Sequence, residues 1–473
     1  MTNALVKKAG TYFIGNLASK ALMAIIIPVY AFFVSPSGVG NYDYWLSLAQ
    51  TATPVMFLAI WEAVLKLLIS SRDEEYNSAA TGTVVIFALI MYLVSILSMA
   101  VAVLLLGADC FMMSSIVLMS GSMGFLQIWQ YFSRAYGKTR AFAFSGVFSS
   151  VVTFAFILIF VCVLSLEEFG LVASYVAGQL AGLLYLESNI RLFRAETISK
   201  FNGPMLARML RYSIPCVFNL IASTLMLSCG RMIIVSSFGV EANGLYAFAL
   251  KFANIVTAVG SIFSMAVIEE GILRAGSKGF GEFYSQVSSS LLVLLLSLAC
   301  VGLPAIALFY DTLGQSDYAP SFSLIPLSLI FAISSVMATQ FGSIFMALGT
   351  TGNQAITTSF GLIASVVISL AFVDYLGVQG VMVGLSAGTV GMMALRFVLA
   401  KQMVLFKLEL RRPLVLSCLY LSCAVVLLRA DFGSTICCHV ICLFVSAFVA
   451  VPLFVKSAKD INHIPNADRE VSN

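Results

Sequence analysis

Residues 80–106, ATGTVVIFALIMYLVSILSMAVAVLLL, form an unbroken apolar run without a charged side chain. A helix rises about 1.5 Å per residue, so about 20 such residues cross the hydrocarbon core of a bilayer. Strands of a membrane barrel would instead alternate apolar and polar residues over segments of about ten. The run therefore predicts a transmembrane helix.

The whole chain has the same apolar character. Of its 473 residues, 60% are hydrophobic and only 10% are charged, and the mean hydropathy is +1.00. Soluble domains carry about 25% charged residues, so the composition excludes a soluble multidomain enzyme. The formal net charge of +4 is modest and does not indicate a nucleic-acid partner.

Apolar runs separated by polar breaks predict an all-α, polytopic membrane protein of about fourteen helices. These spans are expected near 9–33, 43–69, 80–106, 112–133, 141–164, 168–190, 212–236, 243–268, 283–309, 322–347, 353–373, 378–400, 413–428 and 435–455. Of the 26 lysines and arginines, twenty fall in loops on one predicted side, five fall within spans, and only Arg429 lies in a loop on the other side. This positive-inside pattern predicts a multi-pass protein of the bacterial inner membrane with both termini in the cytoplasm.

Glycine motifs repeat along the chain at a nearly constant offset. Residues 40–42 (GNY) match residues 244–246 (GLY) at an offset of 204, and residues 178–182 (GQLAG) match residues 384–388 (GLSAG) at an offset of 206. A repeat of six helices keeps the same orientation, so its axis lies along the membrane normal. The pattern predicts two six-helix bundles in parallel repeat, followed by two extra helices.

This repeat predicts the organisation of the chain. The expected parts are an N-terminal bundle over 1–195, a cytoplasmic interfacial linker over 196–211, a C-terminal bundle over 212–405, and helices 13 and 14 with a cytoplasmic tail over 406–473. In the linker, Phe201, Met205, Leu206 and Met209 fall on one helical face. That face predicts a short helix lying in the membrane interface.

Of the five bases within spans, Arg396 lies near the inner end of predicted helix 12, where snorkelling to the interface is expected. The other four are Lys20, Lys66, Arg231 and Lys251 on predicted helices 1, 2, 7 and 8. An isolated charge at the bilayer centre costs about 2.5–3.5 kcal/mol on insertion scales, and such charges are usually functional. Their shared sign predicts a site for an anionic solute. For Lys66 two structural explanations compete, because Glu62 lies four residues earlier on the same helical face and the side chain can snorkel to the interface.

Three prolines and two carboxylates complete the candidate transport residues. Pro28, Pro54 and Pro215 lie in predicted helices 1, 2 and 7. Each proline removes a backbone hydrogen bond and favours a kink, which would serve gating or would be tolerated without motion. Glu62 and Asp43 are the candidate carriers of a coupling proton or cation.

The sequence contains no pattern typical of a catalytic, metal or cofactor site. The two histidines, His439 and His463, lie near the C-terminus, and the ten cysteines include no CxxC pair. Residues 137–139 (GKT) lack the upstream glycine of a GxxxxGK[ST] nucleotide loop. We therefore expect neither an enzyme nor a bound cofactor.

The chain resembles the polysaccharide and O-antigen flippases of the multidrug/oligosaccharidyl-lipid/polysaccharide exporter superfamily. The resemblance covers essentially the whole length. It rests on two six-helix halves plus a final pair, on the linker of this size, and on Gly-x-Tyr at the start of helices 2 and 8, in residues 40–42 and 244–246. Gly230 precedes Arg231, where the family often has an aspartate.

The resemblance implies a function and its partners. It implies alternating access through a cavity lined by helices 1, 2, 7 and 8, which the four bases would make cationic. The implied substrate is an undecaprenyl-pyrophosphate-linked O-antigen or related repeat unit, moved from the cytoplasmic to the periplasmic leaflet. Membrane lipid is a further partner, and a polysaccharide polymerase and a chain-length regulator are candidate protein partners. The alternative is a multidrug or other small-solute exporter of the same superfamily.

Overall fold

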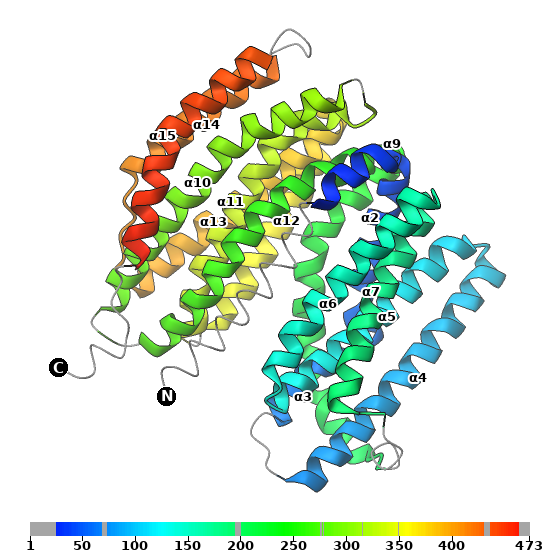
Figure 1. Ribbon diagram of the computed structural model, residues 1–473. Coiled ribbons are helices and arrows are strands. Elements are labelled where there is room, and N and C mark those ends of the chain that lie inside the picture. The colour runs from blue at the N-terminus through cyan, green and yellow to red at the C-terminus, as the bar shows by residue number, and fades with distance from the viewer. Residues whose placement is uncertain are drawn as a thin grey trace. The chain divides into compact units, whose positions relative to one another are not determined.

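The computed structural model describes residues 25–68, 73–193, 200–274, 277, 279–314, 316–348, 350–429 and 436–462 (Figure 1). These residues form helices and connecting segments and contain no strand. A first helix covers residues 25–33. It is followed by α2 (Pro36–Met56), α3 (Ile60–Leu68), α4 (Glu74–Leu106), α5 (Cys110–Ala135), α6 (Thr139–Ile157), η1 (Leu158–Val163), α7 (Glu167–Ile190), α9 (Gly203–Arg274), α10 (Phe280–Leu313), η2 (Ala319–Leu324), α11 (Ile325–Ala347), α12 (Thr351–Leu376), α13 (Val378–Met403), α14 (Arg411–Arg429) and α15 (Ile436–Asn462).

The all-α, polytopic prediction is confirmed, whereas the number of fourteen spans is not. Within the described ranges, 11 helices are long and apolar enough to cross a membrane, or up to 12 when the bent pair α2 and α3 is one span. Residues 9–24 of the first predicted span lie outside the described residues. Predicted spans 212–236 and 243–268 both lie within α9, and Gly239 between them is non-helical, with φ 84° and ψ −179°, so a kink divides α9 where the sequence predicts a break. This backbone conformation is essentially restricted to glycine.

A break in the predicted second span follows Pro54. Helix α2 ends at Met56 and α3 begins at Ile60, with a bend of 54° between them. The Pro54 carbonyl accepts from the Ala59 amide at 3.0 Å, five residues on, instead of from residue 58. Leu58 and Ala59 adopt φ values of 47° and 48°, which disfavour non-glycine residues. The bend therefore lies on the C-terminal side of Pro54, whereas the hydrogen bond that a proline removes lies on its N-terminal side.

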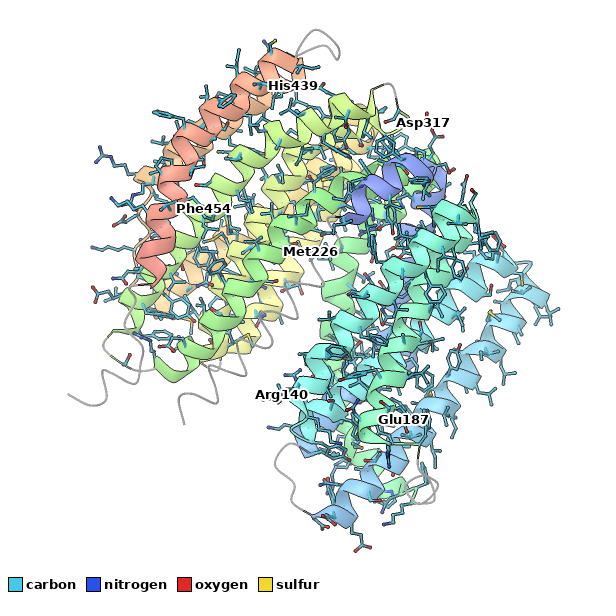
Figure 2. All side chains as sticks on the ribbon, in the orientation of Figure 1. Arg140, Glu187, Met226, Asp317, His439 and Phe454 are labelled. Carbon is cyan, nitrogen blue, oxygen red and sulfur yellow. The ribbon has the colours of Figure 1, made fainter. Side chains whose placement is uncertain are left out.

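The chain forms two compact units, Met1–Val235 and Ser236–Asn473. In the first unit α7 packs against α5 and α6, and α5 also packs against α2 and α3. Its core contains Trp61 and Trp129, and the Trp129 indole N–H donates to the Glu187 carboxylate at 2.7 Å (Figure 2). In the second unit α13 packs against α11 and α12, while α14 and α15 lie beside α10 (Figure 1).

The first unit extends beyond residue 195, where the sequence predicts its end. The segment from Gly203 is the start of α9 and is continuous with the next predicted span, so it is not a separate interfacial helix. Met209 is buried in the core of the first unit, and Met205 and Leu206 pack against that core. The predicted apolar face is therefore covered by protein at Met205, Leu206 and Met209, whereas Phe201 is 47% exposed.

The two glycine motifs make the same kind of helix contact in each unit. A Cβ on Gly178 of α7 would overlap the Thr153 hydroxyl and lie 2.7 Å from the Ser149 carbonyl oxygen, both on α6. A Cβ on Gly384 of α13 would overlap the hydroxyl of Ser369 on α12. Small residues let helix backbones approach closely in membranes. Each unit therefore brings the last two helices of its six-helix repeat together through the same motif.

Candidate substrate site

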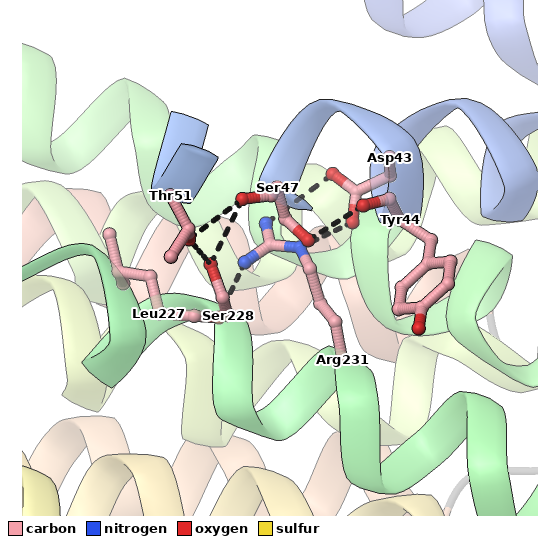
Figure 3. Close-up of polar contacts among 7 residues, drawn as sticks. All are labelled: Asp43, Tyr44, Ser47, Thr51, Leu227, Ser228 and Arg231. Atoms are coloured by element: carbon pink, nitrogen blue, oxygen red, sulfur yellow. Dashed lines mark hydrogen bonds and ion pairs between the residues drawn. The ribbon is translucent and has the colours of Figure 1, made fainter. Parts of the chain in front are cut away.

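An ion pair joins Asp43 of α2 to Arg231 of α9 in the first unit (Figure 3). The Arg231 Nε donates to Asp43 Oδ2 at 2.5 Å, and Nη2 donates to Oδ1 at 3.3 Å. A third guanidinium nitrogen, Nη1, donates to the Leu227 carbonyl oxygen at 2.6 Å, one turn earlier on α9. Both charged side chains are only 15% exposed. The planar guanidinium matches the carboxylate in a bidentate arrangement, which is stronger than a neutral hydrogen bond.

Hydroxyl groups continue this polar contact between α2 and α9. The hydroxyls of Thr51 and Ser228 lie 3.3 Å apart, and Ser228 donates to the Ser47 carbonyl oxygen at 3.4 Å (Figure 3). Asp43, Ser47 and Thr51 follow one another at four-residue spacing, so they share one face of α2. The spacing of Ser228 and Arg231 places them one turn apart on α9. This spacing is the signal in the sequence that would have identified the cluster.

The pairing of Arg231 corrects one expectation from the sequence. The sequence places Arg231 among four bases of a cationic cavity and has glycine at position 230, where the family often has an aspartate, but the structure supplies an acidic partner from another helix. While the pair is formed, its two charges largely cancel. Arg231 can therefore offer its positive charge to an anion only when Asp43 is displaced or protonated. The structure brings these two predicted residues together and thereby suggests a coupled role.

The predicted pair of Glu62 and Lys66 is not formed. Glu62 on α3 instead accepts a hydrogen bond from the Tyr131 hydroxyl of α5 at 3.1 Å. Lys66 is exposed near the end of α3, and the described residues include no ion pair between it and Glu62. The bend after Pro54 changes the direction of α3 relative to α2, so Glu62 faces α5. Its carboxylate remains a candidate for ion coupling, now with Tyr131 as its neighbour.

The remaining predicted residues are distributed over both units. Lys20 lies outside the described residues. Lys251 is half-buried in the part of α9 that belongs to the second unit. Pro28 is exposed within the helix over 25–33, and α9 shows no break at Pro215. A gating role for these prolines stays a prediction.

Arg396 on α13 is a buried base whose environment the sequence did not reveal. Its position near the predicted inner end of helix 12 suggests snorkelling to the interface, but the residue is only 5% exposed. Its guanidinium donates to the Ala338 carbonyl oxygen at 2.9 Å and to the hydroxyls of Thr357 and Thr358 at 3.0 and 2.8 Å. Arg396 therefore ties α13 to α11 and α12 instead of reaching the membrane surface.

The second unit also contains a histidine and carboxylate pair. His439, near the start of α15 (Figure 2), has its Nδ1 atom 2.6 Å from Oδ2 of Asp311 on α10. Within the described residues, no group of three or more histidine, cysteine or acidic side chains could hold a metal ion. The pair therefore connects α15 to α10, and it involves a histidine that the sequence placed near a cysteine cluster.

The comparisons with known proteins agree on the fold. The lipid II flippase MurJ in its inward closed conformation matches with a TM-score of 0.72 and 14% identity, over 96% of this chain and 99% of that chain. An inward-facing multidrug resistance MATE family transporter of the MOP superfamily matches with a TM-score of 0.59 and 14% identity, over 87% of this chain and 94% of that chain. A comparison with curated proteins finds no match.

Both structures have 14% sequence identity to this chain, and what they share with it is an all-helical membrane fold, found in one flippase and one transporter. The class of this chain is therefore a multi-pass membrane protein with the fold of the MOP superfamily. A sequence model described as polysaccharide biosynthesis protein matches residues 5–268, which is more than half of the chain. The chain belongs to the polysaccharide biosynthesis protein family.

Proposed function

We propose that this protein is a flippase for undecaprenyl-pyrophosphate-linked oligosaccharides, such as the repeat units of O antigen. It moves them from the cytoplasmic to the periplasmic leaflet of the bacterial inner membrane by alternating access. The observation that carries the proposal is the match to the polysaccharide biosynthesis family over residues 5–268. The fold shared with a lipid II flippase over 96% of the chain supports it.

The pair of Asp43 and Arg231 supplies a chemical role in this proposal. A diphosphate carries more negative charge than a carboxylate, and it presents several acceptor oxygens to a guanidinium. The headgroup therefore competes with Asp43 for Arg231 when it reaches the site. Release of the headgroup lets the pair form again. The same pair responds to a proton, because protonation of Asp43 removes the charge that holds Arg231. Energy coupling through Asp43 or Glu62 is part of the proposal.

A small-solute exporter is the second candidate, and the MATE transporter with a TM-score of 0.59 is the observation that favours it. Cationic drugs require carboxylates that are available in the substrate site. In the described part of the membrane-spanning helices, Asp43 is occupied by Arg231 and Glu62 accepts from Tyr131. These contacts engage both carboxylates with protein partners, so neither is presented to a cationic drug.

Reconstitution tests the proposed function directly. The purified protein in proteoliposomes is expected to move a fluorescent undecaprenyl-diphosphate oligosaccharide between leaflets, measured as the fraction accessible to a membrane-impermeant quencher. Empty liposomes provide the background, and uptake of a cationic dye under a proton gradient tests the exporter. Dye transport without movement of the lipid-linked sugar would replace the first candidate by the second.

A further inference from the structure

A pocket of about 1250 Å³ opens in the second unit, apart from the ion pair of the first unit. It is lined by residues 280–293 of α10, the end of α13, the start of α14 and Ser457 of α15. Residues 404–409, which we call the strap, connect α13 to α14 along one wall. The basic loops at this end of the helices are the ones that the positive-inside pattern places in the cytoplasm.

The strap is held in place, so the pocket has a defined wall. Phe406 is 1% exposed and packs among aromatic rings of the second unit. After Phe406, the Lys407 amide donates to the Ser285 hydroxyl at 2.9 Å and the Glu409 amide donates to the Ser289 hydroxyl at 3.0 Å. Hydrogen bonds hold the strap to α10, and the Phe406 ring holds it to the aromatic rings on its other side. These two kinds of contact fix the directions in which the strap side chains point.

The charged groups of the pocket favour an anion. Three bases line it, Lys401, Lys407 and Arg412, against two acids, Glu282 and Glu409. The sum, three minus two, is a net charge of +1. Lysine and arginine are the side chains that bind phosphate, the first as a point charge and the second through paired donors.

Unused hydrogen-bond donors point to the same ligand chemistry. Ser457 lines the pocket and is fully buried, and its hydroxyl has no hydrogen-bond partner among the described residues. Buried hydroxyls are normally paired, so a ligand is a natural partner for it. Helix α10 starts at Phe280 in the pocket wall, and Gly279 provides no side-chain cap. The free amides and dipole of a helix N-terminus favour an anion.

The rim of the pocket is apolar where the charged groups end. Leu405 lines the pocket and is 95% exposed. Leu414 is not a lining residue, but it follows the lining residue Arg412 by two positions in the first turn of α14 and is 60% exposed. A soluble phosphate compound would leave these side chains unused, whereas an amphiphile contacts both regions. We propose that the pocket binds the headgroup of an anionic glycerophospholipid, namely phosphatidylglycerol. The acyl chains of this lipid lie along Leu405 and Leu414. This lipid is distinct from the transported substrate.

Delipidated full-length protein tests the site by lipid titration. Native mass spectrometry is expected to show phosphatidylglycerol binding at least tenfold more tightly than phosphatidylcholine or phosphatidylethanolamine of the same acyl chains. The triple variant Lys401→Gln/Lys407→Gln/Arg412→Gln is expected to lose this preference. The matched control, Lys200→Gln/Arg208→Gln/Arg211→Gln, removes three exposed bases of the first unit and is expected to retain it.

A second variant keeps the charge unchanged. Ser457→Ala removes a hydroxyl that bonds to no described residue, so the lipid-free protein should unfold at the wild-type temperature, while phosphatidylglycerol binds several-fold more weakly. Glycerol phosphate, the soluble headgroup analogue, is expected to bind far more weakly than the lipid. The proposal is overturned if the two triple variants lose the preference for phosphatidylglycerol equally. It is also overturned if phosphatidylethanolamine binds as tightly as phosphatidylglycerol, or if glycerol phosphate binds as tightly as the lipid. Unchanged binding in the pocket triple variant and in Ser457→Ala does so as well.

Discussion

Replacement of Arg231 by alanine is expected to slow the flipping of a lipid-linked oligosaccharide by about 100-fold or more. Hydrogen bonds to charged groups contribute about 1.5–3 kcal/mol each, and the loss of two corresponds to about 100-fold or more in rate or affinity. The variant also leaves Asp43 without its partner in a site where its side chain is 15% exposed. The remaining negative charge then repels a diphosphate. Flipping is measured in proteoliposomes at matched protein content.

Companion variants distinguish a role of the Asp43–Arg231 pair in substrate binding from a role in joining α2 to α9. Asp43→Asn/Arg231→Gln replaces the ion pair by neutral groups of similar shape, so the unfolding temperature should remain close to that of wild type while flipping is lost. Asp43→Asn alone frees the guanidinium, so we expect tighter apparent binding of the substrate with a lower maximal rate. Arg208→Ala removes an exposed base and serves as the control. Full flipping by the neutral double variant would show that the pair only joins α2 to α9.

Gly384→Ala is expected to destabilise the second unit by about 2 kcal/mol. The new methyl group would lie 2.6 Å from the Ser369 amide nitrogen and 2.7 Å from the Ser365 carbonyl oxygen, so α12 and α13 must separate. Overpacking of this kind costs about 1–3 kcal/mol, and here it acts on backbone atoms that cannot rotate away. The midpoint of thermal unfolding in detergent is the measurement.

Gly302 offers a matched control on α10 of the same unit. A Cβ on Gly302 meets nothing within 4 Å, so Gly302→Ala should be neutral or stabilise by up to about 1 kcal/mol through helix propensity. The first unit provides an independent pair of variants. Gly178→Ala should destabilise it as Gly384→Ala does the second, and Gly146→Ala should not. Equal effects of Gly384→Ala and Gly302→Ala would contradict the close-packing explanation.

The helices and their order were predictable because membrane insertion imposes a strong local signal. A run such as 80–106 needs no tertiary partner to be recognised, and the structure has α4 over Glu74–Leu106. The glycine motifs were also predictable as packing faces, because residues four apart share a helix face. The division of α9 was predictable as well, because the sequence ends one span at 236 and begins the next at 243, and the non-helical Gly239 lies between them.

The candidate site was predictable in its residues and not in their pairing. Arg231 was identified as a base within a span and Asp43 as a candidate coupling carboxylate, but they are 188 residues apart in the chain. Glu62 and Lys66, four residues apart, were expected to pair, yet Glu62 bonds to Tyr131. Local spacing sets which pairs are geometrically allowed, whereas competition with partners on other helices sets which pairs form.

The sequence by itself determined that this protein is a helical membrane protein built from two similar halves. Hydropathy and glycine spacing are local properties, so they can be recognised within one segment without knowledge of its neighbours. Only the tertiary structure decided that Arg231 is neutralised by Asp43, that Arg396 is buried, and that the strap closes one wall of a pocket. The physical reason is that burial and charge compensation depend on which helices meet. Those contacts join residues whose separation in the chain carries no periodic signal.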